Sequence, residues 1–248
     1  MTSPACWPSS RVADRQEERL VASVAATNVG RTAISAGQVV RRRASWDALV
    51  DFRRTATEIR YADDFILCFQ YREDAERVLE VLRKRFAKYG LTLHPEKTRL
   101  LAFGRSALPS GPDAQRPATF DFLGFTHVCA RSRRGRFTIH VRTMRKRLRR
   151  SVKAVAQWCQ QHRHDPVENQ AAALNAKLRG HDQYYGRPTN YHGLWRFHRA
   201  VRQLWHKWLN RRTRGKPLDW RSFEQLLLRH PLRPPRIMHA WVGSGSPR

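Results

Sequence analysis

The chain has 248 residues, and its 48 Lys and Arg against 20 Asp and Glu give a formal net charge of +28. Such a charge favours a polyanionic partner, because a strong positive field attracts phosphates and gains affinity by releasing their condensed counterions. Arginine greatly outnumbers lysine, which suits forked contacts to phosphate and stacking on bases. We therefore expect nucleic acid, and not a membrane, as the partner.

Targeting and redox signals are weak. No run of about 18 apolar residues occurs, and residues 1–40 lack the basic-then-apolar order of a signal peptide. The expected location is the cytoplasm. The four cysteines are widely spaced without a Cys-x-x-Cys pair, which argues against a zinc ribbon or a disulfide framework.

The first 56 residues show no clear structural pattern. They begin with a turn-rich stretch, continue through small and weakly periodic residues, and contain three consecutive arginines at 41–43. Turn residues, weak periodicity and repeated like charge do not specify a folded unit. We predict that residues 1–56 are poorly specified, and either flexible or not native to the rest of the chain.

A clearer pattern begins at Thr57. Two β-prone runs, TEIRYA and FILCFQY, flank Asp63 and Asp64, which predicts a hairpin with the aspartates at or beside its turn. Apolar residues at helical spacing follow up to Tyr89, and Gly90 supplies a helix stop. After further extended segments and a Pro/Gly/Ser-rich linker, residues 120–128 and 136–141 predict a second hairpin that turns at the basic run RSRRGR.

The remainder of the chain is predicted to be helical. Apolar stripes at helical spacing start at Met144, Leu174 and Leu194, and a last short helix is predicted from Trp220 to Arg229. The predicted fold class is therefore α+β, with antiparallel hairpins and one helix first and an all-helical bundle second.

The adjacent aspartates suggest metal-dependent chemistry. Nucleotidyl transfer uses divalent ions about 3.5–4 Å apart, and Mg²⁺ is usually held by one or two carboxylates together with substrate phosphates. A tight hairpin can present Asp63 and Asp64 toward one metal site. The alternative is a chemically idle Asx-type turn. The position of the aspartates between two apolar strands favours the catalytic interpretation.

Four motifs carry a family resemblance. Tyr61-Ala62-Asp63-Asp64 matches the catalytic hairpin of reverse transcriptases, and RYADDFILC resembles the version in bacterial group II intron reverse transcriptase/maturases. GLTLHPEKTRL (residues 90–100) resembles the next palm motif, FDFLGF (residues 120–125) the primer-grip hairpin, and LNAKLRGHDQYYG (residues 174–186) the signature of the maturase or thumb domain. The motifs occur in the family's order, across residues 57–241.

The resemblance implies roles for the palm residues. Asp63 would be a metal ligand of a two-ion Mg²⁺ site, Asp64 would contribute less directly to coordination, and Tyr61 and Ala62 would lie against the template-primer duplex. Lys97 would steer the triphosphate or protonate the pyrophosphate leaving group. A solvated loop lysine remains an equal alternative for Lys97.

A primer-grip role would apply to the strand FDFLGF, with Gly124 allowing its backbone to approach the primer terminus closely. The alternative is a plain core hairpin. Tyr184 and Tyr185 are candidates for stacking on unpaired RNA bases, whereas Trp205 and Trp208 lie on a helical stripe and are expected in the core.

Basic residues indicate an RNA-binding surface without reference to any family. No Asp or Glu occurs from residue 122 to 164, although such runs usually carry counter-charges when they are only solvated faces. Arg142, Arg145, Arg149 and Lys153 recur at spacings of three and four, opposite the apolar stripe of the predicted helix. We expect this face to meet phosphates.

The sequence also departs from the family. A working palm carries another carboxylate on an upstream strand and a Pro-Gln-Gly segment, and neither occurs in residues 1–56. We therefore expect a truncated chain with an incomplete metal site that is inactive alone. A frameshift, a wrong start, and a split enzyme in which a separate chain supplies the fingers and the upstream palm remain alternatives. No Cys-x-x-Cys pair follows Trp241, so DNA cleavage by a zinc-bearing endonuclease is not expected.

The predicted domains are a poorly specified segment (1–56), the C-terminal part of a palm (57–127), a basic hairpin and connection (128–141), a helical thumb/maturase domain (142–241) and a tail (242–248). The predicted function is that of an RNA-directed DNA polymerase of a group II intron, with dNTPs and template-primer as substrates and maturase-type binding of intron RNA. The alternative is a non-catalytic maturase remnant that binds RNA and aids intron folding or splicing.

Overall fold

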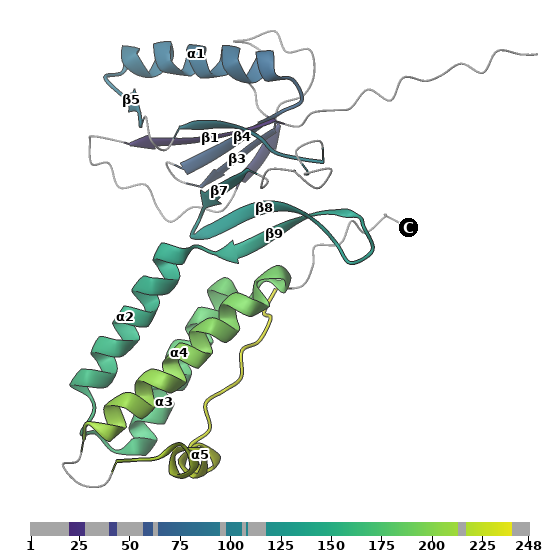
Figure 1. The fold of residues 1–248 in the computed structure, drawn as a ribbon. Coiled ribbons are helices and arrows are strands. Elements are labelled where there is room, and N and C mark those ends of the chain that lie inside the picture. Colours follow the sequence, from purple (N-terminus) through teal and green to yellow (C-terminus); the bar gives the residue numbers. More distant parts are fainter. Residues whose placement is uncertain are drawn as a thin grey trace, which may run out of the picture. The chain divides into compact units, whose positions relative to one another are not determined.

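The computed structural model describes residues 57–61, 64–94, 98–105, 108, 118–212 and 217–239 in full, and the backbone of residues 20–27 and 40–43 (Figure 1). These residues fall into two compact units, residues 1–118 and 119–248. The border lies before residue 127, where we expected the palm segment to end, so the second predicted hairpin belongs with the helices by compactness. The assignment of functional domains stays a prediction.

The first unit is built on an antiparallel sheet whose strand order differs from the sequence order. Its strands run in the order β2-β3-β4-β1-β5, and β6 also pairs with β1. The strands are β1 (Leu20–Thr27), β2 (Val40–Arg43), β3 (Thr57–Tyr61), β4 (Asp64–Phe69), β5 (Thr92–Leu93) and β6 (Arg99–Ala102). All of the described pairings are antiparallel, so this unit has the hairpin architecture that the sequence predicts.

Helix α1 (Arg72–Lys88) packs on one face of this sheet (Figure 1). Alternate residues of β4 point toward it, as the two-residue period of a strand requires. Gly90, with φ +64°, donates its N–H to the Ala87 carbonyl and ends the helix where the sequence predicts. The resulting core cluster contains Phe65, Leu67, Phe69, Ala75, Val78 and Leu82.

Two stretches of the N-terminal segment differ from the expectation that residues 1–56 are poorly specified. Residues 20–27 form β1, which lies in the sheet between β4 and β5, and residues 40–43 form β2 at its edge. The physical reason is tertiary pairing, because β1 finds its partners in residues 64–69 and 99–102, far along the chain. The rest of the segment lies outside the described residues.

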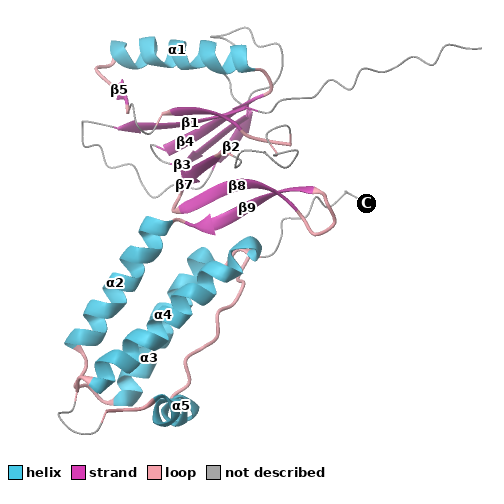
Figure 2. Cartoon of the chain, viewed as in Figure 1, coloured by secondary structure: helices cyan, strands magenta, loops and turns pink. Residues whose placement is uncertain are grey.

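The second unit joins a three-stranded antiparallel sheet to four helices (Figure 2). The sheet has the order β7-β8-β9, with β7 (Thr119–Phe122), β8 (Phe125–Arg131) and β9 (Phe137–Thr143). The helices are α2 (Arg145–Gln161), α3 (Val167–Tyr185), α4 (Tyr191–Asn210) and α5 (Trp220–Arg229), and a 3-10 turn, η2 (Pro188–Asn190), precedes α4. The α+β fold class and the last short helix are confirmed.

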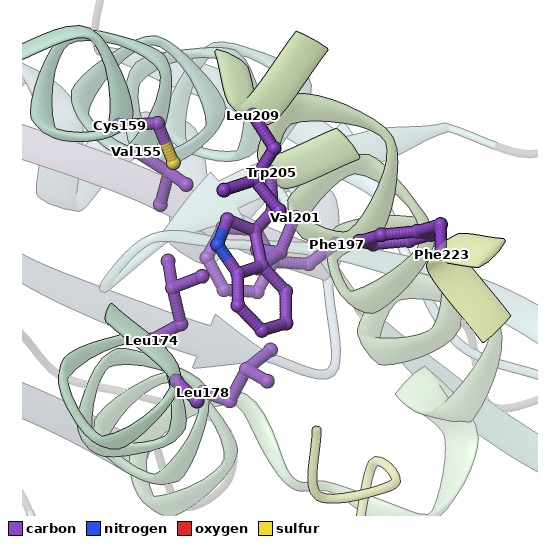
Figure 3. Packing of buried hydrophobic residues seen from close by; sticks show 10 residues of the cluster. Val155, Cys159, Leu174, Leu178, Phe197, Val201, Trp205, Leu209 and Phe223 are labelled. Carbon is purple, nitrogen blue, oxygen red and sulfur yellow. The ribbon is translucent and has the colours of Figure 1, made fainter. Parts of the chain in front are cut away.

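Trp205 lies at the centre of the helical core (Figure 3). The side chains around it come from all four helices, including Val155 of α2, Leu174 of α3 and Phe223 of α5. Its indole N–H is satisfied inside the core, because Nε1 donates to Gln170 Oε1 at 2.9 Å. The prediction that Trp205 is a core residue is confirmed, and Trp208 packs against the same cluster.

A C-terminal strap, residues 231–239, runs along α3. Asn175 accepts a hydrogen bond from the Arg233 N–H at 2.7 Å, and Asp182 Oδ2 accepts one from the Arg236 N–H at 3.0 Å. The Met238 N–H then donates to the Gly186 carbonyl at 2.9 Å. These bonds fix an otherwise extended segment to the helix, since backbone groups need partners wherever water is excluded.

Two local details differ from the sequence predictions. The run FDFLGFTHV is not one strand, because Leu123 and Gly124 form a tight turn between β7 and β8. Arg142 lies on β9 and not on the helix, since α2 begins at Arg145 after Met144. Among the described helices, none combines the length and the apolar character needed to cross a bilayer.

Candidate active site and nucleic-acid interface

Strands β3 and β4 form the antiparallel hairpin that the sequence predicts on either side of the two aspartates. Their register pairs Tyr61, the last residue of β3, with Asp64, the first residue of β4. Asp64 is half-buried at the end of the strand, and the residues that follow it, from Phe65 to Leu67, are buried. The apolar strand therefore anchors the carboxylate at the sheet end, while the Tyr61 side chain is 37% exposed.

Asp63, Ala62 and Lys97 lie outside the described residues. The structure therefore brings together Tyr61 and Asp64 from the predicted palm site and leaves the contribution of the other three as a prediction. In the sequence, only Ala62 and Asp63 separate β3 from β4.

The strand beside the hairpin supplies no carboxylate. β1 pairs with β4 in a register that sets Ala25 opposite Asp64, and its sequence is LVASVAAT. Among the described residues, no group of three His, Cys, Asp or Glu side chains could hold a metal ion. Asp63, the other carboxylate of the predicted Mg²⁺ site, lies outside the residues that were searched.

The β7–β8 turn has an unusual backbone that neighbouring groups hold in place. Leu123 has φ +49° and Gly124 has φ +78°, and the left-handed region is unfavourable for leucine by about 1–2 kcal/mol. The Met144 N–H donates to the Gly124 carbonyl at 3.0 Å, just before α2 begins. A residue in such a conformation persists only where its surroundings over-determine it.

Tyr184 and Tyr185, at the end of α3, complete the support of this turn. The Tyr184 hydroxyl donates to the Leu123 carbonyl at 2.9 Å, and its ring stacks on Phe125 at 5.7 Å between centroids. A Cβ on Gly124 would lie 3.4 Å from the Tyr185 hydroxyl oxygen. Burial raises the pKa of the Tyr185 phenol, so this hydroxyl stays protonated. RNA contact by the two tyrosines stays a prediction, whereas their contact with the turn is a feature of the fold.

Residues that the sequence analysis did not single out fix β9 to the bundle. Thr189 Oγ1 accepts a hydrogen bond from the Val141 N–H, and Asn190 Oδ1 accepts one from the Thr143 N–H, both at 2.9 Å. Asn190 Nδ2 also donates to the Tyr185 carbonyl. The only sequence signal was a polar pair after a proline, which is common to ordinary turns. The hairpin and α2 therefore share one framework with the end of α3.

The basic face that the sequence predicts is solvent-exposed. Arg142 on β9 and Arg145, Arg149 and Lys153 on α2 are all exposed, whereas the apolar stripe of α2 packs into the core through Val155 and Cys159. No acidic residue occurs in the first turn of α2. Backbone N–H groups at that end and the arginine side chains together make the helix start electropositive.

Comparison with protein families identifies one segment. Residues 40–127 match the family model of reverse transcriptase (RNA-dependent DNA polymerase). The matched segment contains β3, β4, α1 and the β7–β8 turn, and so includes Tyr61, Asp64 and Gly124. This stretch of the chain is therefore similar to a reverse transcriptase domain. No curated protein matches the chain.

The match begins at Val40, so it includes residues 40–56 of the segment that was predicted to be poorly specified. It ends at residue 127, so the helical part from residue 142 onward lies outside it. The group II intron and maturase assignments rest on motif resemblance alone.

Proposed function

We propose that this chain derives from an RNA-directed DNA polymerase of a group II intron, with residues 57–127 acting as part of the palm and residues 142–241 as a thumb/maturase domain that binds intron RNA. One observation carries the proposal: the segment that matches the reverse transcriptase family contains a short antiparallel hairpin with Asp64 at the first position of a buried strand. The motif order around it supports the finer assignment.

In this proposal Asp63 and Asp64 contribute carboxylates to a Mg²⁺ site, whose ions would supply charge stabilisation at the reacting phosphates. The β7–β8 turn would support the primer terminus, and Lys97 would approach the triphosphate of an incoming dNTP. Residues 1–56 contain neither the family's upstream carboxylate motif nor its Pro-Gln-Gly segment, so in this proposal another chain that carries the fingers and the upstream palm would supply the remaining ligands.

Primer extension on an RNA template with Mg²⁺ and dNTPs tests the proposal, with the chain alone and with a chain that supplies the upstream palm. Extension should require the second chain and should be lost in the double variant Asp63→Ala, Asp64→Ala. The matched control is Glu76→Ala with Glu80→Ala, which removes two exposed carboxylates from α1 in the same unit. Extension that survives the aspartate change but not the control would contradict the assignment of the hairpin.

A second candidate function, a non-catalytic maturase remnant, is favoured by the uncompensated basic face of α2 and β9. If this candidate is right, the chain binds RNA but does not extend a primer, either alone or with the second chain. Affinity should fall steeply with salt, because each phosphate contact releases counterions, and the aspartate variants should bind as the parent chain does. Extension by the complemented chain would exclude this candidate.

A further inference from the structure

A second acid-free stretch lies in the helical unit, separate from the face of α2. Residues 183–218 contain no Asp or Glu and include the whole of α4. Their basic residues are Arg187, Arg196, Arg199, Arg202, Lys207, Arg211, Arg212, Arg214 and Lys216. A stretch of this length without counter-charges complements a polyanion more than it suits an ordinary solvated helix.

One stripe of α4 lies outside its core face. Positions 195, 199, 202 and 206 follow each other at the helical spacing of three and four residues, so their side chains leave the helix on one side. The core face of α4 is complete without them, since it buries Leu194, Phe197, Val201, Trp205 and Leu209. The stripe lies beside this core face, and its last member, His206, contacts Phe223 of the core cluster at 4.9 Å between ring centroids.

Helix α5 covers the C-terminal half of the stripe. Arg202 donates to Glu224 at 2.8 Å, and the His206 ring stacks on Trp220 at 4.0 Å between centroids. The first contact pairs an arginine with a carboxylate, and the second stacks two aromatic rings. This side of α4 therefore binds an anionic group and an aromatic ring within the protein itself.

The N-terminal half of the stripe carries large aromatic rings in contact with solvent. Tyr191 is 44% and Trp195 is 45% exposed, although α4 has enough apolar residues to bury elsewhere. The Trp195 ring makes an edge-to-face contact with the His198 ring at 5.3 Å between centroids. Arg199, one turn further on and about 6 Å along the helix axis, is exposed beside them.

We propose that Tyr191, Trp195 and Arg199 form a binding site for an unpaired nucleobase and its adjoining phosphate in a single-stranded nucleic acid. The aromatic rings stack on the base, a contact that every base can make, and Arg199 pairs with the phosphate. The three residues lie within residues 142–241, so this inference deepens the nucleic-acid binding proposed for that domain and rests on it. Duplexes, whose bases are already stacked, would not use it.

Binding of 12-nucleotide single-stranded RNA, single-stranded DNA of the same sequence and a 12-base-pair RNA duplex to the full chain tests the site. Trp195→Ala should weaken both single strands about fivefold to 100-fold, the range typical for one stacked base, and leave the duplex unchanged. Trp195→Phe should keep affinity within about threefold, because the ring remains. Preference for the RNA strand over the DNA strand would identify a contribution from the 2′-hydroxyl.

Two further variants distinguish base stacking from nonspecific apolar contact and from phosphate pairing. Trp195→Leu keeps an apolar side chain without a ring and should bind as weakly as the alanine variant. Arg199→Gln should lower the salt slope by about 0.7, the share of one phosphate in a single strand, while the Trp195 variants leave the slope unchanged. Tyr89→Ala, which removes a 71% exposed tyrosine after α1, is the matched control and should have no effect.

The proposal is overturned if Trp195→Ala binds the single strands as the parent does, if Trp195→Leu restores affinity, or if duplex affinity falls equally. A change in oligomeric state with unchanged nucleic-acid affinity would also overturn it, since the patch would then be a protein interface. None of these outcomes depends on Mg²⁺ or on primer extension, so they are independent of the fate of the polymerase proposal.

Discussion

Helices α1 and α2 have the same length, 17 residues each, and the same amphipathic plan, yet their outer faces differ. Helix α1 carries both acidic and basic residues, with ion pairs from Arg72 to Glu76 and from Lys84 to Glu80 at 2.8 Å. On α2, the outer face is basic without a single carboxylate. A helix that meets only water can balance its charges, so the imbalance of α2 points to a partner that supplies the anions.

The largest effect should come from neutralising the outer face of α2. Arg145→Gln, Arg149→Gln and Lys153→Gln together should weaken RNA binding about 100-fold or more near 0.1 M salt and lower the salt slope by about 2–3, since three phosphate contacts are lost. Affinity measured across a salt series checks this.

The control for that experiment lies on α1. Arg77→Gln, Arg83→Gln and Lys88→Gln change the net charge of the chain by the same amount on another exposed helix. Their effect on RNA affinity should stay within about threefold, because long-range charge alone is screened at this ionic strength. Equal losses in the two triple variants would remove the distinction between the helices.

The pH dependence of stability tests whether the core of the helical unit holds its histidine uncharged while the surface of the unit is cationic. Burial lowers the pKa of His181 to about 4, and its ring stacks on Phe197 at 3.9 Å between centroids. An unfolded histidine takes up its proton near pH 6.5. The stability of the helical unit should therefore fall as the pH drops from about 6.5 toward 4, by about 2 kcal/mol between pH 7 and 5.

His181→Phe, which keeps an aromatic ring between its neighbours, should remove most of that loss in thermal or denaturant unfolding at the two pH values. Burial also lowers the pKa of His198, so part of the loss should remain. Burial raises the pKa of Asp182, which acts in the opposite sense and is common to parent and variant. An unchanged pH profile in His181→Phe would exclude His181 as its source.

A matched pair of core changes tests whether the two helices differ only on their outer faces. Val78 on α1 and Val155 on α2 are 2% and 3% exposed. Val78→Ala and Val155→Ala should each destabilise their own unit by about 1–2 kcal/mol, from lost burial and the cavity left behind. Chemical denaturation measures both values, and a strong disparity would mean that one helix packs less tightly than its burial implies.

The smallest expected effect concerns the ion pairs of α1. Glu76→Gln with Glu80→Gln should lower stability only slightly, because both pairs are exposed and screened by salt. The difference should shrink in 1 M salt, which separates the ionic contribution from helix propensity. A larger loss that persists in high salt would show that these carboxylates do more than balance charge.

The sequence predicted those features that depend on neighbours in the chain. The hairpin at Asp64, the end of α1 at Gly90 and the short helix at Trp220 follow from local patterns of turn residues and apolar spacing, and the structure has all three. The predicted exposure of Arg145 and Arg149 also follows from helical periodicity.

What the sequence could not predict depends on distant contacts. The residues of β1, LVASVAAT, are small and show no clear alternation, and they become a strand by pairing with residues more than 35 positions away. The left-handed Leu123 is supported by Tyr184, 61 positions later, through a single hydroxyl. No local pattern marks such partners, so the tyrosines could be predicted only as exposed rings.

Gly186 connects the end of α3 to the C-terminal strap, and its backbone leaves no room for a side chain. A Cβ there would lie 2.9 Å from the Met238 nitrogen and 3.0 Å from the Arg236 carbonyl oxygen, and closer still to the Asp182 carbonyl oxygen. The residue allowed at position 186 should therefore depend in evolution on the C-terminal strap, some fifty residues further along the chain. Lineages that keep the strap should keep the glycine, and a lineage that replaces it should have lost or rerouted the tail.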